Sequence, residues 1–357
     1  MRFSLLFFWG LCALAGSLAA QQAPKYSNEF LTLGVGARAL GMGQAQTATV
    51  GDVTAGYWNP AGLTRIEGRY EGALMHAAYF AGIANYDYAG FATQIDSTSV
   101  LGITALRFGV DDIPDTRFLY DPTSGQIDFN RVRFFAAADW AFLLSYAKRD
   151  VLLPGLRLGA NFKVIYRQVG NFADAWGFGL DGGAQYDVGQ WRFGLTAHDI
   201  TSTFNAWSYN TVEIDSILIA DPRSAFPETA VEITLPRWRL GVARRVAFGE
   251  RFGALLTTDL VFTFDGRRNV LVSGDPVSID PAVGLELDYR QRVFLRGGVN
   301  NGQRTRNFDG SEQTEVQPNF GLGVRLGQFQ IDYALTNIGD FSETLYSNVF
   351  SLRATFP

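Results

Sequence analysis

The sequence predicts an all-β protein: a transmembrane antiparallel β-barrel of about 14 strands, with a small N-terminal plug inside its lumen. Three observations predict it: an N-terminal export signal, a Gly- and Ala-rich segment after it, and a long series of segments that alternate apolar and polar residues. After the signal, no apolar run approaches the roughly 20 residues of a transmembrane helix. A soluble all-β protein of the same period is the alternative.

Residues 1–20 have the pattern of a secretory signal peptide. Arg2 supplies the positive charge, Leu5 to Leu14 form a short apolar core, and small residues up to Ala20 offer a cleavage site. The single cysteine, Cys12, lies within this signal. The mature chain is therefore expected to lack disulfides and cysteine metal sites. The predicted destination is the cell outer membrane, reached through a cleaved signal peptide.

The charge and the titratable residues exclude several function classes. The formal net charge of -5 without a basic cluster argues against nucleic acid as a partner. His198 is followed by Asp199, but neighbouring strand residues point to opposite faces, so this pair does not form a catalytic dyad. We expect no enzyme activity, no cofactor and no metal site. Calcium binding by Asp111, Asp112 and Asp115 in an outer loop is left open.

The barrel is predicted over residues 68–357. In Leu156 to Arg167, for example, every second residue is apolar, while Arg157, Lys163 and Arg167 lie on the opposite, lumen-facing side. Connections after even-numbered strands are short and most of those after odd-numbered strands are long, which places the short turns in the periplasm. The predicted strands are 68–80, 83–95, 98–109, 131–147, 155–168, 175–188, 190–202, 232–247, 251–264, 280–290, 292–300, 316–326, 328–337 and 346–356.

Residues 21–67 have too few apolar residues for an independent core and are predicted to fold inside the barrel as a luminal plug. Within them, the stretch from Gly34 to Leu63 contains several uncommon residues in a fixed order. This stretch resembles the start of the PorV/PorQ family, which is related to the FadL-type transporters of hydrophobic compounds. Gln44 and Gly51 depart from the family pattern. The residues of this plug motif are Arg38, Gly41, Met42, Gly43, Trp58, Asn59 and Pro60.

We expect the plug motif to be structural, because Gly and Ala permit close backbone approach and Pro60 restricts Asn59 to an extended conformation. A direct ligand contact at Asn59 is the alternative. The last strand ends in Phe356 and is similar to the strand that the barrel-assembly machinery recognises. Outer-membrane lipid and this machinery are therefore expected partners.

The resemblance implies a non-enzymatic barrel that binds or scaffolds secreted proteins or components of a type IX secretion system. Aromatic residues in the long outer segments Val110 to Asn130 and Thr203 to Val231 are the candidate partner-binding residues, because aromatics supply much of the binding energy of protein interfaces. They are Phe118, Tyr120, Trp207, Tyr209 and Phe226. The alternative is a FadL-like passive transporter of hydrophobic small molecules. An apolar lumen favours transport, and a plugged polar lumen favours the scaffold.

Overall fold

The structure is a computed structural model that describes residues 27–121, 124–210, 229–306, 311–336 and 347–357. These residues form one antiparallel sheet of 16 strands, which closes on itself where β5 pairs with β6. The strands are β1 (Tyr70–Tyr79), β2 (Ala84–Gln94), β3 (Ser99–Asp115), β4 (Arg133–Arg149), β5 (Arg157–Val169), β6 (Ala173–Val188), β7 (Trp191–His198), β8 (Thr203–Tyr209), β9 (Thr229–Thr234), β10 (Arg237–Phe248), β11 (Phe252–Thr263), β12 (Ser278–Tyr289), β13 (Val293–Arg306), β14 (Glu312–Leu326), β15 (Phe329–Thr336) and β16 (Ser347–Phe356).

The 16 strands occupy 14 positions, so the predicted all-β barrel of 14 strands is confirmed. Strand β6 pairs with β7 through its second half and with β8 through its first half, which puts β7 and β8 at one position. They are separated at Asp199 and Ser202, which both have positive φ. Strands β9 and β10 share the next position and are separated at Pro236, whose nitrogen cannot donate to the sheet.

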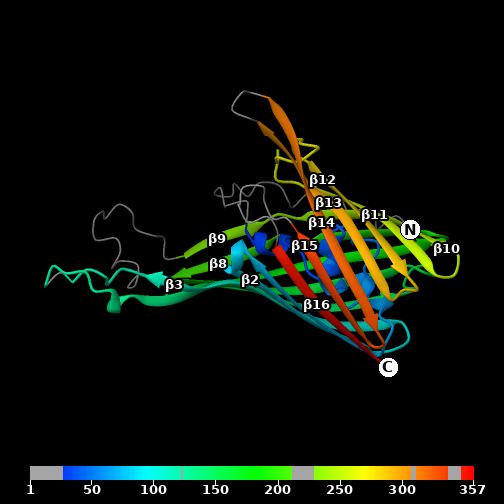
Figure 1. Cartoon of the computed structure of the whole chain (residues 1–357), viewed down its shortest axis with the longest axis horizontal. Helices are drawn as coiled ribbons and strands as arrows, with labels where there is room; N and C mark the ends of the chain where they lie inside the picture. The colour runs from blue at the N-terminus through cyan, green and yellow to red at the C-terminus, as the bar shows by residue number, and fades with distance from the viewer. Residues whose placement is uncertain (1–26, 122–123, 211–228, 307–310, 337–346) are drawn as a thin grey trace, which may run out of the picture.

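Two predicted outer loops contain strands. The prediction that Thr203 to Val231 is a loop is wrong at both ends, because β8 and β9 lie there and pair with each other. Likewise β3 continues to Asp115 within the predicted loop from Val110 to Asn130, after a register shift between Val110 and Ile113. In Figure 1 the β3–β4 hairpin extends beyond the rest of the barrel wall. In this extension β3 and β4 continue to pair with each other after the register shift.

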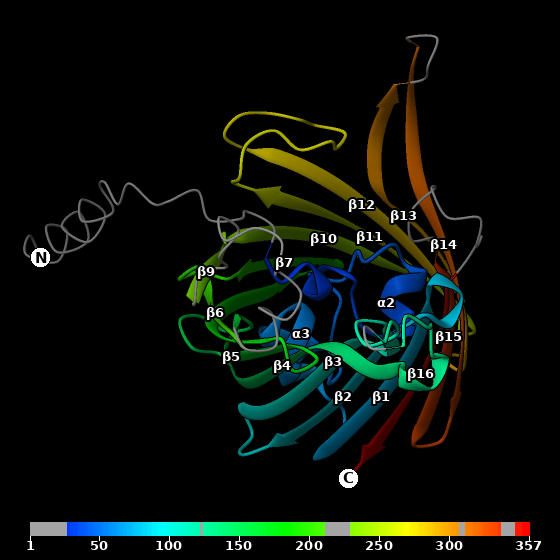
Figure 2. The same ribbon diagram turned by 90° about the vertical axis from the view of Figure 1, so that its left-hand side faces the viewer.

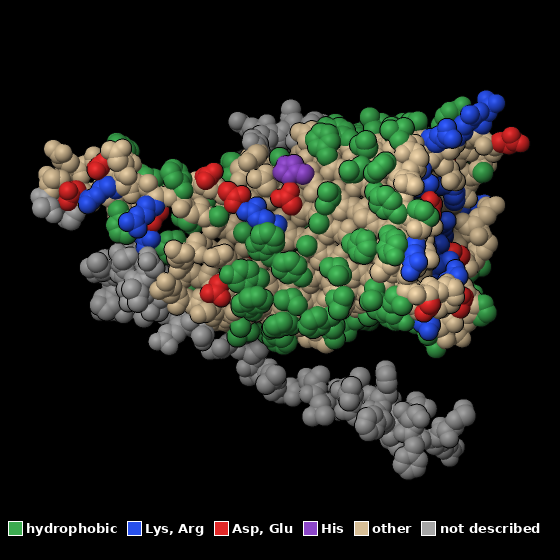
Figure 3. Space-filling view, turned by 90° about the horizontal axis from the view of Figure 1, so that it is seen from below, with side chains coloured by type: hydrophobic (Ala, Val, Ile, Leu, Met, Phe, Trp, Pro, Cys, Tyr) green, Lys and Arg blue, Asp and Glu red, His purple; other side chains and the backbone are tan. Residues whose placement is uncertain are grey.

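The outer and inner faces of the wall differ as the alternation predicts. Large apolar side chains such as Leu74, Phe91, Phe142 and Phe178 are exposed on the outside, and polar side chains alternate with them inside. Figure 3 shows the apolar side chains over the middle of the wall, with Lys and Arg gathered at one end. That end carries the short turns, which are periplasmic in barrels of this kind.

The segment Ser27 to Ile66, here called the inner segment, lies within the ring of strands (Figure 2). It contains η1 (Glu29–Thr32), α2 (Ala37–Gly41), α3 (Ala55–Trp58) and η2 (Pro60–Arg65). Two further 3-10 turns, η3 (Phe80–Gly82) and η4 (Phe129–Arg131), lie in connections between strands. In the described part of the chain, no helix is long and apolar enough to cross a membrane.

The apolar core of the protein joins the inner segment to one side of the wall. Leu40, Trp58 and Leu63 of the inner segment are buried in one cluster with Tyr86 and Leu106 of β2 and β3. On the opposite side, towards β10–β14, the contacts of the inner segment are mainly polar or backbone contacts. The lumen is therefore filled tightly on one side and retains cavities on the other.

Candidate functional site

The glycines of the plug motif lie against glycines of the wall. A Cβ on Gly43 would lie 2.7 Å from the backbone nitrogen of Val299, and one on Gly298 would lie 2.2 Å from the nitrogen of Gly43. A Cβ on Gly41 would lie 2.9 Å from Cα of Gly321. Real Cβ atoms do not approach backbone this closely, so this contact requires glycine on both sides.

Asn59 fixes the other end of the inner segment to the wall. Its buried Nδ2 donates to the carbonyl oxygens of Thr47, at 2.9 Å, and of Ala184 in β6, at 3.1 Å. Its Oδ1 accepts a hydrogen bond from the nitrogen of Ala61, at 3.2 Å, and so caps η2, which begins with Pro60. Such a cap is worth about 1 kcal/mol. All hydrogen bonds of this motif are to protein groups, which agrees with a structural role; the role itself stays a prediction.

A chain of ion pairs continues from Arg38 into the wall. Its Nε donates to Oε2 of Glu286 in β12 at 2.9 Å, and the same oxygen accepts from Nε of Arg296 in β13 at 2.7 Å. Arg296 also donates from Nη1 to Oδ1 of Asp332 in β15 at 2.7 Å. Arg296 is fully buried, so these carboxylates compensate a charge that would otherwise be costly to bury.

Two buried aspartates hold the loop that follows α2. Oδ2 of Asp259 in β11 accepts three hydrogen bonds, from the nitrogens of Gln46 and Thr47 and from Oγ1 of Thr47. Asp52 of the inner segment pairs with Nη1 of Arg353 in β16 at 2.9 Å. Burial alone would raise the pKa of Asp52, but the nearby guanidinium groups of Arg353 and Arg38 hold that pKa below its usual value.

A buried cluster of titratable groups lies near the break between β7 and β8. Nζ of Lys163 in β5 is 3.0 Å from Oδ1 of Asp181 and 2.6 Å from Oδ1 of Asp199. His198 lies near the same cluster, with Nδ1 at 4.0 Å from Asp181. Lys163 thus faces two carboxylates inside the wall.

Two cavities lie on opposite sides of the inner segment. The extracellular cavity, of about 510 Å³, lies between η1 and the outer halves of β10–β14 and the β11–β12 loop. The periplasmic cavity, of about 350 Å³, is lined by residues of α2, η2 and the turn-side ends of the strands. The loop from Met42 to Gln46 and α2 lie between the two cavities. Both are lined mainly by polar and charged side chains.

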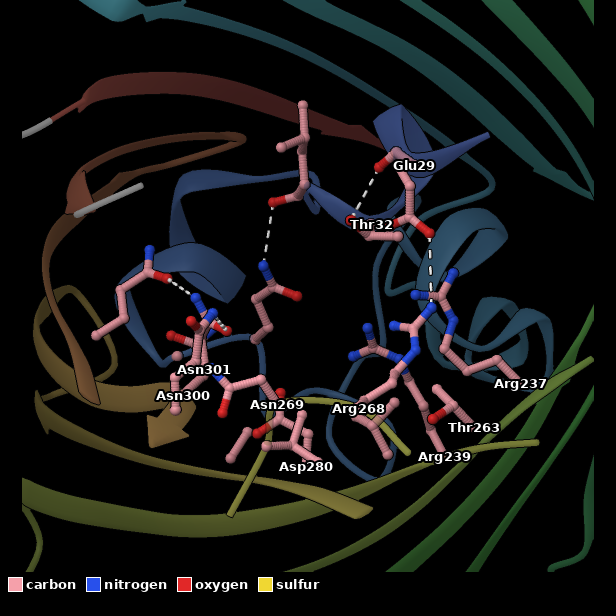
Figure 4. A pocket seen from close by; sticks show the side chains of 18 of the residues that line it. Glu29, Thr32, Arg237, Arg239, Thr263, Arg268, Asn269, Asp280, Asn300 and Asn301 are labelled. Carbon is pink, nitrogen blue, oxygen red and sulfur yellow. Dashed lines mark hydrogen bonds and ion pairs between the residues drawn. The ribbon is translucent and has the colours of Figure 1, made fainter. Parts of the chain in front are cut away.

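Arginines dominate the extracellular cavity. Arg237 and Arg239 enter it from β10, and Arg267 and Arg268 from the β11–β12 loop, opposite Glu29 of η1 (Figure 4). Arg268 pairs with Asp265 at 2.8 Å. Alternation by itself places Arg239 among many lumen-facing residues and does not distinguish it from them. The signal that was missed is the Arg-x-Arg spacing after Pro236, which directs both side chains to the same face.

The predicted partner-binding residues are placed differently from one another. Phe118 and Tyr120 are 39% and 59% exposed near the end of the β3–β4 hairpin. Trp207 is only 9% exposed, because it lies in β8 with its ring against Arg167; the prediction that it is a surface loop residue is wrong. Tyr209 is half-buried and stacks on Trp207. Phe226 lies outside the described residues, as does the predicted signal peptide, residues 1–20.

Two of the three acidic residues considered for calcium binding, Asp111 and Asp115, have protein partners. Asp111 pairs with Arg107 at 2.5 Å, and Asp115 pairs with Arg117 at 2.8 Å. Over the residues that the structure describes, His, Asp and Glu form no group of three that could hold a metal ion.

Comparison with known proteins shows the fold. No family model and no curated protein matches the sequence. Among solved structures, the toluene transporter TbuX of Ralstonia pickettii is 14% identical with a TM-score of 0.54, over 91% of this chain and 99% of that chain. The toluene transporter TodX of P. putida is 12% identical with a TM-score of 0.55, over 90% and 99%. A FadL homologue of Pseudomonas aeruginosa is 13% identical with a TM-score of 0.51, over 90% and 98%.

These likenesses extend over nearly the whole of each chain. Together with the apolar outer face, they identify the fold of this chain as that of an outer-membrane β-barrel of the FadL type, built from 14 strand positions.

Proposed function

We propose that the protein is a passive transporter of small molecules across the outer membrane. The observation that carries this proposal is the pair of cavities on opposite sides of the inner segment, of about 510 Å³ and 350 Å³. Each has the size of a small-molecule site. A molecule that enters from outside would occupy the first cavity, pass the loop from Met42 to Gln46, and leave through the second. The fold likeness to hydrocarbon transporters and channels supports the same class of activity.

The lining argues for a cargo other than a hydrocarbon. Leu33, Val261, Val270 and Ala282 are the apolar side chains of the extracellular cavity, and the other side chains there are polar or charged. A hydrocarbon would have to displace water from arginine and amide groups without replacing their hydrogen bonds, which is costly. Passage of hydrophobic compounds is therefore the less favoured form of the proposal.

The proposal is tested with purified protein in liposomes. Uptake of a small polar solute set, including a neutral sugar and an organic acid, is compared with uptake of toluene, and protein-free liposomes give the background. We expect protein-dependent uptake of at least one polar solute. Uptake equal to the background for every solute would reject transport.

A scaffold for secreted proteins is the second candidate, and one observation favours it. The β3–β4 hairpin extends beyond the wall and exposes the aromatic rings of Phe118 and Tyr120. Exposed aromatics on a rigid hairpin suit a protein partner, such as the type IX cargo or machinery that the PorV/PorQ resemblance implies. Capture of such a partner by the wild-type protein, with no solute uptake in liposomes, would favour this candidate.

A further inference from the structure

Two arginines of the extracellular cavity have no acidic partner. Arg239 is 6% exposed, and its guanidinium packs over the ring of Trp58 at 5.2 Å. Nε of Arg237 is buried without a hydrogen-bond partner among the described residues. Among the described residues, neither side chain is within ion-pair distance of a carboxylate, whereas Arg38, Arg268, Arg296 and Arg353 are each paired with one.

The nearest acids act on Arg239 only from a distance: Asp259 and Asp280 attract its charge, but among the described residues neither forms an ion pair with it. Oδ2 of Asp259 accepts hydrogen bonds from Gln46 and Thr47 of the inner segment, and Asp265 pairs with Arg268 at 2.8 Å. Asp280 lines the same cavity but lies apart from the guanidinium groups of Arg237 and Arg239 (Figure 4). A buried guanidinium whose N–H groups lack acceptors is costly, so an anion bound directly to these two groups would stabilise the arrangement.

We propose that Arg237 and Arg239 form an anion-binding site for a water-soluble organic acid, with its carboxylate on the two guanidinium groups. The planar fork of arginine matches the two oxygens of a carboxylate. The rest of the cavity carries amide and hydroxyl side chains, among them Asn269, Asn300 and Thr263, which suit the hydroxyl groups of a sugar acid. This site specifies the ligand class of the proposed transporter. Its role in passage of the ligand rests on that proposed function.

The position of the site suits an entry step. Arg237 and Arg239 line both the extracellular cavity and a small inner cavity that contacts Tyr57, Lys163 and the β7–β8 break. An acid held there would lie at the innermost part of the outer cavity, next to the inner segment. Anion binding and release at this point would precede passage through the lumen.

The test is isothermal titration calorimetry of the full-length protein in detergent with D-galacturonate, with D-galactose as the neutral comparison. We expect saturable binding of galacturonate that weakens with ionic strength, and no binding of galactose. Arg239→Lys keeps the charge but loses the fork, so it should bind about tenfold more weakly, and Arg237→Gln should do the same. Arg244→Gln is the matched control, because Arg244 is on the same strand but faces away from the lumen near the periplasmic rim.

Each outcome decides between the claims. Unchanged galacturonate affinity in both Arg239→Lys and Arg237→Gln, with a heat-modifiable folded barrel, would overturn the site. Tighter binding of inorganic phosphate than of galacturonate would overturn the carboxylate assignment. Arginine-dependent binding without uptake in liposomes would support the site and reject transport. Uptake that is equal in wild type and Arg239→Lys would support transport and reject the site.

Discussion

The contact between Gly298 of β13 and the plug motif predicts a defined effect of one methyl group. In Gly298→Ala, the new Cβ would lie 2.2 Å from the nitrogen of Gly43 and 2.2 Å from the carbonyl carbon of Met42. Both atoms belong to the backbone and cannot rotate away, so the loop between the two cavities must move from the wall. Overpacking of this kind costs about 1–3 kcal/mol.

The neighbouring residue provides a matched control. A Cβ on Gly297 would have no atom within 4 Å, and both residues are on the same strand. A cost of about 1–3 kcal/mol on the seated position of the inner segment in Gly298→Ala shifts the equilibrium between the seated and the displaced segment by roughly 5- to 150-fold towards the displaced one. Gly298→Ala should therefore show faster solute uptake in liposomes and faster proteolysis of the inner segment, while Gly297→Ala behaves like wild type. Equal uptake and equal proteolysis of the two variants would refute the reasoning.

Three further substitutions have expected outcomes. Asp52→Asn removes the ion pair with Arg353 and should destabilise the inner segment by about 1–3 kcal/mol. Because the pKa of Asp52 is lowered in the folded state, this stabilisation is present above the unfolded pKa and is lost as the pH falls through the folded pKa. In urea titrations the variant should therefore lose less stability in acid than wild type. Lys163→Met leaves two buried carboxylates unpaired and should lower stability by about 3–5 kcal/mol, seen as a lower temperature of gel-shift unfolding; an unchanged temperature would contradict the pairing. Replacing Phe118 and Tyr120 with Ser should leave solute uptake unchanged, and a loss of uptake would show that the hairpin takes part in transport.

Much of the fold follows from local patterns. Alternation of apolar and polar residues has a period of two in every strand, so it predicts the wall and the direction of side chains such as Lys163 and Arg239. The predicted strand boundaries fail around β8 and β9, because two strand positions are interrupted, one from Asp199 to Ser202 and one at Pro236. The interruption at Pro236 has a sequence signal, but β8 is aligned by pairing with β6 and β9 by pairing with β8, and neither pairing has a local signal. The burial of Trp207 follows from these pairings and has no local signal.

The site is harder to predict than the fold. The plug motif was found because its residues are uncommon and ordered, whereas its contacts with Gly298 and Gly321 depend on which strands the inner segment meets. Arg237 and Arg239 differ from the paired arginines only in lacking a carboxylate at the same height of the barrel. That difference depends on the relative heights of many strands, which periodicity does not give.

The central claim is that solute passes through the lumen by way of the extracellular cavity, and a blocked cavity tests it most directly. Cys12, the only cysteine, lies in the predicted signal, so Thr263→Cys would place a single thiol in the cavity lining of the mature protein. Ser97→Cys, at an exposed residue of the β2–β3 turn, is the control. We predict that a bulky thiol reagent abolishes solute uptake in liposomes through Thr263→Cys and leaves uptake through Ser97→Cys unchanged. Full uptake through completely modified Thr263→Cys would contradict the claim.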